Sequence, residues 1–396
     1  MSGFVYKLRR LCAVVIGTVF FLSGIFKLMD PVGTGLIVAE YFKFFHISFL
    51  DFGAGIAGIF LALLETLTGA ALITNVFRKA AAITASVMTL FFTVVTVFLL
   101  IFNPNMSCGC FGKVVELTHM QSFMKNVVLC VLCADAFLPF RDFGSPAGVK
   151  YAAFALVASA VIAGTVFCAV SLPPVDYTAF APGAELYTEN DAEEVPDFGE
   201  TAAFIYEKDG RQGVFTLDRL PDSTWTFVGT DTLRRELPIA EKEIAVLSFT
   251  DMEGEYCDYM ATEGKVMVVS FYDPEGLSAR VREGLPALKA RLLSAGFTPL
   301  FIFASAPSRL DVPEGIEPYF ADYRTLVALN RSNGGATYIS DGTVIRKWAG
   351  KFIPDGEGLE KAAKTNPADL AVSTVTKGRI RLQAFLLYGF AVMLLL

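Results

Sequence analysis

Charged residues are scarce at the start of this chain. They make up 18% of its 396 residues, few of them lie in residues 1–172, and hydrophobic residues reach 54% overall. With a mean hydropathy of +0.51, this composition excludes an ordinary soluble protein. Residues 173–376 carry more charge, and residues 381–396 are apolar again. We therefore expect a membrane domain, a polar domain and a C-terminal anchor.

An excess of positive charge is also absent. The chain has a net charge of −7, and acidic residues outnumber basic ones in residues 173–376. This balance argues against nucleic acid as a partner and against tight docking of the polar domain to anionic lipid. Solubility is the simplest meaning of the acidic surface.

Five apolar stretches have about the 20 residues that a bilayer-spanning helix needs. They are Leu11–Met29, Gly53–Val76, Ala80–Phe102, Phe123–Phe140 and Tyr151–Leu172. A sixth, Leu382–Leu396, is short and either spans or lies partly in the interface. The segment Gly33–Leu50 is too polar to span, so a re-entrant or interfacial position fits it. The first stretch lacks a small-x-small cleavage site, so we expect an uncleaved helix and no signal peptide.

Basic residues in the short loops predict the orientation. Three clusters share one face: Lys7 with Arg9 and Arg10, Arg78 with Lys79, and Arg141 with Lys150. By the positive-inside rule the N-terminus is cytoplasmic, and residues 103–121 and the large polar domain face outward. We therefore expect a multi-pass protein of a bacterial inner (plasma) membrane with a periplasmic domain. Three cations fall on the outer side against the rule: Lys377, Arg379 and Arg381.

Two thiols one residue apart, Cys108 and Cys110, stand at this predicted outer surface. The periplasmic side is oxidising and permits disulfides. A bridge between them needs a bent backbone, which Gly109 makes accessible, and a strained bridge is easily reduced. We therefore expect Cys108 and Cys110 to be a catalytic pair for thiol–disulfide exchange. Two alternatives stay open: a structural turn, and a zinc or copper site begun with His119 but lacking a fourth ligand.

Other polar groups in the apolar stretches raise further hypotheses. Glu65 lies mid-way along the second stretch, where a carboxyl costs several kcal/mol unless it is protonated, paired or hydrated. It either handles protons or contacts a quinone head, or it bonds to a neighbouring helix. Lys27 and Asp30 are three residues apart and can pair on one helical face. Cys130 and Cys133 share a face of an apolar helix, where thiols are inert and usually part of the core.

These features resemble the DoxX-like superfamily and, within it, the methylamine-utilisation MauE branch. The resemblance covers about residues 8–142 and rests on Ser23-Gly24, Lys27, Asp30-Pro31, Glu65, Gly69 and Cys108-Gly109-Cys110-Phe111-Gly112-Lys113. It implies a four-helix membrane bundle linked to the periplasmic maturation of a disulfide-rich partner. The layout is similar to the disulfide-forming enzymes DsbB and vitamin K epoxide reductase, which carry a Cys-x-x-Cys pair near a quinone. That similarity suggests a quinone beside Glu65, although this chain has Cys-x-Cys.

The polar domain begins with a linker, residues 173–200, and a small β region. Two strands flank a Lys208-Asp209-Gly210 turn, Phe204–Tyr206 and Val214–Thr216, and Trp225–Val228 is a third. Strands and helices then alternate. The expected strands are Val246–Thr250, Val266–Tyr272, Pro299–Ala304, Ala336–Ser340 and Thr343–Trp348, and the helices are Glu275–Ala295, Tyr323–Arg331 and Gly358–Lys364.

This order resembles the thioredoxin-like fold of periplasmic TlpA-like proteins over residues 240–365. The reactive Cys-x-x-Cys of that fold follows its first core strand, but here Asp273–Leu277 contain no thiol. The cis-proline of that fold is replaced by Gly335-Ala336. The resemblance therefore implies a degenerate domain that binds or positions a partner.

The sequence thus predicts a multi-pass α-helical bundle joined to an α/β thioredoxin-like extracytoplasmic domain. Its parts are a DoxX/MauE-like bundle (1–142), a fifth transmembrane helix (143–172), a linker with a small β region (173–240), a degenerate thioredoxin-like domain (241–368) and an anchor (377–396). The expected partners are the lipid bilayer and a periplasmic client. The expected function is thiol–disulfide exchange or periplasmic protein maturation; the alternative is a non-enzymatic membrane scaffold.

Overall fold

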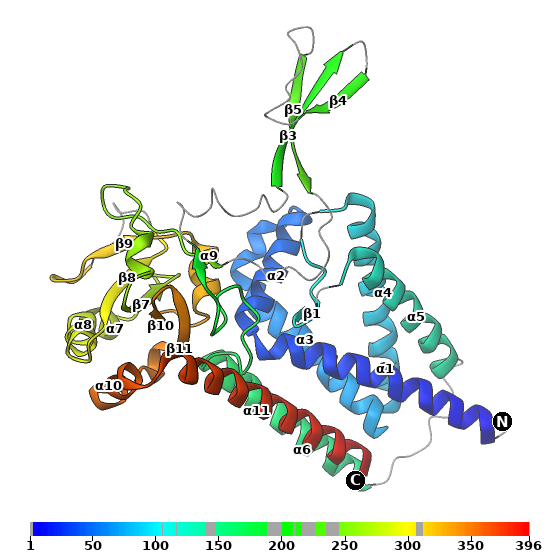
Figure 1. Ribbon diagram of the computed structural model, residues 1–396. Helices are drawn as coiled ribbons and strands as arrows, with labels where there is room; N and C mark the ends of the chain where they lie inside the picture. Colours follow the sequence, from blue (N-terminus) through cyan, green and yellow to red (C-terminus); the bar gives the residue numbers. More distant parts are fainter. Residues whose placement is uncertain are drawn as a thin grey trace.

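The structure is a computed structural model that describes residues 3–104, 106–115, 117–138, 148–187, 200–208, 211–215, 226–234, 245–305 and 312–395. A helical part is followed by a part built on β-sheets (Figure 1). Five helices within the described residues are long and apolar enough to cross a membrane. They are α1 (Gly3–Met29), α3 (Ala54–Thr74), α4 (Arg78–Phe102), α5 (His119–Phe137) and α6 (Gly148–Val170). The five expected spans are confirmed, and α1 begins earlier than predicted because its basic start is helical too.

The segment between α1 and α3 forms a second, shorter helix. It is α2 (Pro31–Phe44), followed by a 3-10 helix (Ser48–Gly53). Asp30 caps α2, because its carboxylate accepts a hydrogen bond from the Gly33 backbone nitrogen at 2.9 Å. At 14 residues α2 is about 21 Å long, too short to cross a bilayer. It packs against α3 at the end of the bundle that carries the loop between α4 and α5 (Figure 1). This loop contains Cys108 and Cys110 and is called the cysteine loop below.

Glycines bring α1 and α3 into backbone contact. A Cβ atom at Gly24 would lie 2.7 Å from both the Ala62 carbonyl oxygen and the Thr66 nitrogen. A Cβ atom at Gly17 would lie 2.9 Å from the Gly69 carbonyl oxygen. Lipid tails are as apolar as leucine, so helices in a bilayer associate through such close packing. The two glycine contacts therefore fix the spacing on which the polar groups of α1 and α3 depend.

We expect Gly24→Ala to destabilise the bundle by about 1–3 kcal/mol, the usual cost of overpacking. The obstructing atoms include backbone atoms, which cannot rotate away. Thermal denaturation of the purified chain in detergent measures the effect. Gly55→Ala is the matched control: its Cβ would meet no atom within 4 Å, and alanine favours the helix by about 1 kcal/mol. Equal melting temperatures for the two variants would contradict the packing argument.

Basic side chains gather at the end of the bundle away from α2. Arg10 donates to the carbonyl of Leu72 at 2.5 Å and to that of Ile73, in the last turn of α3. Arg9 donates to the carbonyl of Leu138, just after α5, at 2.8 Å. Cations at helix C-termini satisfy free carbonyls and interact favourably with the helix dipole. The arginines thus stabilise the helix ends as well as marking one face of the bundle.

The C-terminal part is organised around a five-stranded sheet with the order β11-β10-β7-β8-β9. The strands are β7 (Lys265–Phe271), β8 (Thr298–Phe303), β9 (Pro318–Phe320), β10 (Gly335–Ser340) and β11 (Thr343–Trp348). Strands β7, β8 and β9 are parallel to one another. Strand β10 lies between β7 and β11 and pairs antiparallel with both. The helices are α7 (Ala279–Glu283), α8 (Leu285–Ser294), α9 (Tyr323–Leu329) and α10 (Gly356–Lys364). Buried apolar side chains fill both faces of the sheet.

Most of the predicted α/β elements appear in the structure at the expected places. The turn between β10 and β11 has positive φ at Asp341 (46°) and Gly342 (74°), as the Asp-Gly pair predicts. Strand β9 was not predicted, because it is only three residues long. The expected strand Val246–Thr250 is wrong in extent: only β6 (Ala245–Val246) forms, paired in parallel with β2 (Leu186–Tyr187).

The small β region is a separate three-stranded sheet with the order β4-β3-β5. Its strands are β3 (Glu200–Lys208), β4 (Arg211–Phe215) and β5 (Thr226–Arg234). The predicted hairpin is therefore present, while its Asp209-Gly210 turn lies outside the described residues, as do residues 188–199 of the linker. Figure 1 shows this sheet standing apart from the larger one.

The predicted C-terminal anchor is the second half of a long helix, α11 (Pro367–Leu395). Its start belongs to the α/β core, since Leu370 and Ala371 are buried there. Further on, α11 packs beside α6 (Figure 1). At Gly378 the helix backbone meets the Pro174 carbonyl, where a side chain would have no room. The domain built on the five-stranded sheet, from here on the sheet domain, is thus attached to the bundle by a continuous helix.

Candidate functional site

The cysteine loop between α4 and α5 folds back into the end of the bundle. Its middle residues form β1 (Cys110–Lys113), which packs against α1. Gly109 has a φ of +61°, a conformation that L side chains rarely adopt, and Ile37 of α2 lies 2.6 Å from where its Cβ would be. The glycine between the two thiols is therefore required by both the turn and the neighbour.

Cys108 is buried and bonded on several sides. The Ser122 hydroxyl, on α5, lies 2.8 Å from its sulfur. The Tyr41 hydroxyl, on α2, donates to its carbonyl at 2.8 Å. The Cys108 sulfur also lies 3.6 Å from the Leu117 carbonyl oxygen. With 8% of its surface exposed, Cys108 is held in one position by two helices.

Cys110 is more exposed than Cys108 and differs from it electrostatically. Both are free thiols. The hydrogen bond from Cys108, followed by the positive charges of Lys125 and Lys27, lowers the pKa of Cys110 to about 5. The same hydrogen bond, together with burial, raises the pKa of Cys108. The two shifts run in opposite directions, which favours the thiolate on Cys110 and the proton on Cys108.

A polar chain links this loop to Glu65. The Lys27 ammonium lies 2.6 Å from the Glu65 carboxylate and 3.3 Å from the Ser23 hydroxyl. Ser23 in turn donates to the carbonyl of Cys110. The ion pair is almost fully buried, with side-chain exposures of 11% and 5%. The expected pairing of Lys27 with Asp30 is wrong, because Lys27 reaches across to α3.

The quinone expectation fails a test of fit at Glu65. Its carboxylate is bonded to Lys27, and the residue is 3% exposed, so no face of it is free for a quinone head. A cavity of about 720 Å³ lies elsewhere in the structure, and neither thiol nor Glu65 lines it. We therefore derive no step through a quinone.

The metal alternative has no support from the ring of His119. Its two nitrogens lie 3.3 Å from the Asn103 amide oxygen and 3.0 Å from the Met106 carbonyl. Among the described residues, no group of three or more histidines, cysteines or carboxylates is arranged to hold a metal ion. His119 is instead placed to hold the start of the cysteine loop against α5.

The remaining thiols lie away from this loop. Cys130 and Cys133 face α4, with Thr93 and Thr89 at 3.4 and 3.8 Å from their sulfurs. Cys12 lies 3.5 Å from the Asp135 carboxylate on α5. These thiols are spaced along helix–helix contacts, as core residues are.

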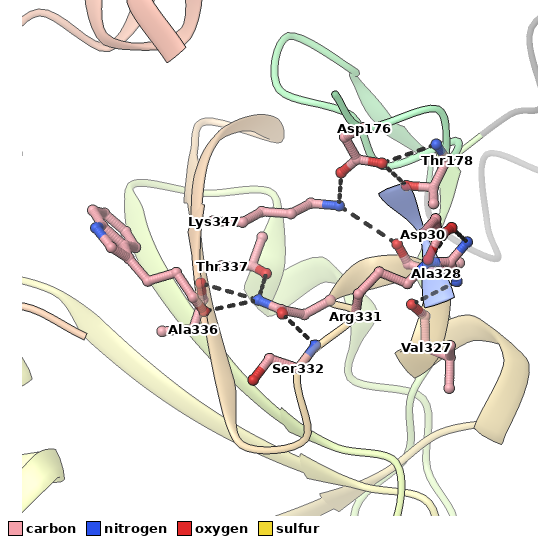
Figure 2. A network of polar contacts seen from close by, with 12 residues as sticks. Asp30, Asp176, Thr178, Val327, Ala328, Arg331, Ser332, Ala336, Thr337 and Lys347 are labelled. Carbon is pink, nitrogen blue, oxygen red and sulfur yellow. Dashed lines mark hydrogen bonds and ion pairs between the residues drawn. The ribbon is translucent and has the colours of Figure 1, made fainter. Parts of the chain in front are cut away.

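A second polar cluster joins the sheet domain to the bundle (Figure 2). Arg331, just after α9, lies 2.9 and 3.0 Å from one carboxylate oxygen of Asp30, through Nη2 and Nε. Beside it, Lys347 of β11 pairs with Asp176 at 2.6 Å. Arg324 and Glu40 form a longer pair, at 3.4 Å. The cap residue of α2 is therefore also a docking point for the sheet domain.

Several of these partners were not predicted from the sequence. Ser122 and Lys125 lie three apart on α5 with Asn126 beside them, so the polar stripe on an otherwise apolar helix was a usable signal. Tyr41 lay in a segment read only as interfacial. Arg331 pairs with a residue 301 positions away, which no local pattern reveals.

Comparisons with known proteins bear on two parts of the chain. Residues 5–139 match the family model described as methylamine utilisation protein MauE. Residues 201–234, which span the three-stranded sheet, match a domain of unknown function, DUF8463. No curated protein and no solved structure matches the chain. Residues 5–139, which contain the thiol pair, Lys27 and Glu65, are a MauE-type membrane domain.

Proposed function

We propose that this MauE-type membrane protein exchanges disulfides with a periplasmic client through Cys108 and Cys110. The observation that carries the proposal is the placement of two free thiols one residue apart in a bent loop, with Ser122 against the Cys108 sulfur. The lowered pKa of Cys110 supports it. The thiolate is the reactive form of cysteine, and a neighbouring thiol can resolve a mixed disulfide. Cys110 is the more exposed of the two and so is the sulfur that meets the client.

The exchange starts from the oxidised pair, which the two free thiols reach by passing two electrons and two protons to another disulfide-bearing protein. In the oxidised protein the pair forms a disulfide, and a client thiolate attacks the Cys110 sulfur. The Cys108–Cys110 bond breaks, Cys108 leaves as a thiolate and takes a proton, and a mixed disulfide joins Cys110 to the client. The client's second thiolate then attacks its own bonded sulfur, which releases Cys110 as a thiolate. The client has gained a disulfide, and this protein has been reduced by two electrons.

The electrostatics favour this direction. Groups that stabilise the Cys110 thiolate stabilise the reduced pair, and a stabilised reduced form makes the oxidised form a stronger oxidant. A low-pKa sulfur is also the better leaving group in the last step. Cys110 carries this property because the hydrogen bond from Cys108 and then the charges of Lys125 and Lys27 lower its pKa.

The sheet domain is proposed to present the client to the thiols. The order β11-β10-β7-β8, with helices between β7 and β8 and after β11, supports a thioredoxin-like fold. The loop after β7 has no thiol, and its Asp273 is bonded to Asn333 by two hydrogen bonds of 3.1 and 2.7 Å. A closed loop without cysteine suits binding better than redox chemistry.

The sidedness proposed is that of an inner-membrane protein with a cytoplasmic N-terminus. The bundle end with Arg9 and Arg10 would face the cytoplasm, in line with the positive-inside rule. The cysteine loop and the sheet domain lie at the other end (Figure 1) and would face the periplasm. There the oxidising compartment permits the disulfide form of the pair.

Oxidised glutathione is a suitable probe of the exchange in purified full-length protein. We expect Cys108→Ser to accumulate a stable glutathione adduct on Cys110, seen by mass spectrometry of the 103–118 peptide. In the wild type Cys108 should displace the glutathione and leave the Cys108–Cys110 disulfide. In Cys110→Ser the adduct should form on Cys108 at least about tenfold more slowly, because burial both shields that thiol and raises its pKa. Stable adducts on both cysteines of the wild type would refute exchange.

A non-enzymatic scaffold is the second candidate, favoured by the partly buried ion pair between Asp30 and Arg331 that fixes the sheet domain to the bundle. It predicts that a Cys108→Ser, Cys110→Ser double variant complements a deletion strain fully. Loss of complementation by a stably expressed double variant would exclude it, and normal complementation would exclude the exchange proposal.

A further inference from the structure

A cavity of about 720 Å³ lies where the bundle, the start of the polar domain and α11 meet. Its membrane-side wall is apolar and comes from three helices: Leu28 on α1, Val161 on α6, and Leu382 and Phe385 on α11. Its other wall is formed by residues 173–177 and β11. The cavity therefore passes from the apolar helices to the polar domain.

The polar wall is strongly cationic. Six basic side chains line the cavity, against the single carboxylate of Asp176: Arg331, Arg346, Lys347, Lys377, Arg379 and Arg381. Asp176 forms an ion pair with Lys347, and Arg331 forms an ion pair with Asp30. The four remaining cations make no ion pair with any carboxylate in the described part of the chain. Arg346 instead stacks on the ring of Trp348, 5.2 Å from its centre.

These cations include the three that violate the positive-inside rule. Lys377, Arg379 and Arg381 lie within five residues on α11, just before its apolar half begins at Leu382. The overall acidity of the polar domain argues against an anionic partner only for its surface as a whole. The lining of the cavity, in contrast, carries a net positive charge. Like charges held together without a counter-ion repel one another. An anion in the cavity would relieve that repulsion.

We propose that this cavity binds an anionic phospholipid, with its phosphate on the cations and an acyl chain against the apolar wall. Guanidinium groups match phosphate oxygens in a bidentate geometry, and lysine adds a point charge. Phe385 lies one helical turn beyond Arg381, so the head and the chain of one lipid would follow the same helix. A free phosphate compound shares the head chemistry but would leave the apolar wall empty. Neither Cys108 nor Cys110 lines the cavity, so the proposal does not depend on disulfide exchange.

Native mass spectrometry of the full-length protein in detergent tests the proposal with three probes. They are dioleoyl phosphatidylglycerol, dioleoyl phosphatidylcholine and glycerol phosphate. We expect the wild type to retain phosphatidylglycerol at least about tenfold better than phosphatidylcholine, because both lipids carry the phosphate but the choline ammonium of phosphatidylcholine would be repelled by the cations of the cavity. Equal retention of the two lipids would overturn the proposal. Retention of glycerol phosphate at the level of phosphatidylglycerol would overturn the lipid in favour of a soluble phosphate compound.

A charge variant locates the binding. Arg379→Gln with Arg381→Gln should abolish the preference for phosphatidylglycerol. Lys361→Gln with Lys364→Gln, on the exposed face of α10, removes the same charge outside the cavity and should preserve it. An unchanged preference in the Arg379 and Arg381 variant would exclude this cavity as the site. The headgroup comparison in the wild type needs no variant, so it decides the proposal even if the double variant does not fold.

Discussion

Alkylation of Cys110 is expected to be almost independent of pH between pH 6 and pH 8. With a pKa of about 5, its thiolate fraction rises by only about a tenth over that range. An ordinary cysteine, with a pKa of about 8.5, gains about 75-fold in thiolate over the same range. The flat profile follows because the hydrogen bond from Cys108 and the charges of Lys125 and Lys27 keep the sulfur ionised.

Two opposing factors set the alkylation rate of Cys110 relative to an ordinary cysteine at pH 6. Cys110 has about 300-fold more thiolate than an ordinary cysteine, but a thiolate of lower basicity is about 40-fold less nucleophilic. The net expectation is alkylation about tenfold faster at pH 6. Iodoacetamide labelling of the full-length protein, read peptide by peptide, gives this rate. Cys257 of the sheet domain serves as the internal reference, since partial burial and Asp251 raise its pKa.

Two variants test the cause of the flat profile. Cys108→Ala removes the hydrogen-bond donor and should move the midpoint of the Cys110 profile upward by the largest amount. Lys125→Met removes a nearby charge and should move it upward by less. A Cys110 profile that rises with pH in parallel with that of Cys257 would show that the thiolate is not stabilised.

The sequence was most informative where the pattern is local and repeated. Apolar runs of about 20 residues located the five spans, and the Asp341-Gly342 turn located its hairpin. Glu65 and Lys27 were both singled out, but their pairing was not. Lys27 had a plausible partner nearby in the sequence, Asp30, and Glu65 was expected to bond to a neighbouring helix without a named residue. The real contact depends on how closely Gly24 and Gly69 let two helices approach. Helix spacing is a tertiary property that composition does not encode.

The thiol pair shows the same limit. The sequence placed Cys108 and Cys110 together and supplied the bend at Gly109. It did not show that Ser122 would bond one sulfur and Lys125 would lie beside the other. The difference in proton affinity between the two thiols comes from α5, which packs beside the loop only in the folded bundle.

The second large effect concerns the buried ion pair of Lys27 and Glu65. We expect Glu65→Leu to destabilise the protein by about 3–5 kcal/mol, because it leaves the Lys27 charge buried without a partner. The double variant Lys27→Met with Glu65→Leu should recover most of the loss, since it leaves no buried charge. Thermal denaturation in detergent measures all of them. Glu360→Leu, which breaks the exposed pair with Lys364, is the control and should cost no more than about 0.5 kcal/mol.

The double variant also separates a structural role of the ion pair from a chemical one. If the pair only holds α1 to α3, the restored bundle should leave the reactivity of Cys110 unchanged. We expect a change, because the Lys27 charge helps to lower the pKa of Cys110. The midpoint of its alkylation profile should therefore rise in the folded double variant, though by less than in Cys108→Ala. Recovered stability with an unchanged midpoint would assign Lys27 and Glu65 to packing alone and leave Cys108 and Lys125 as the groups that activate the thiolate.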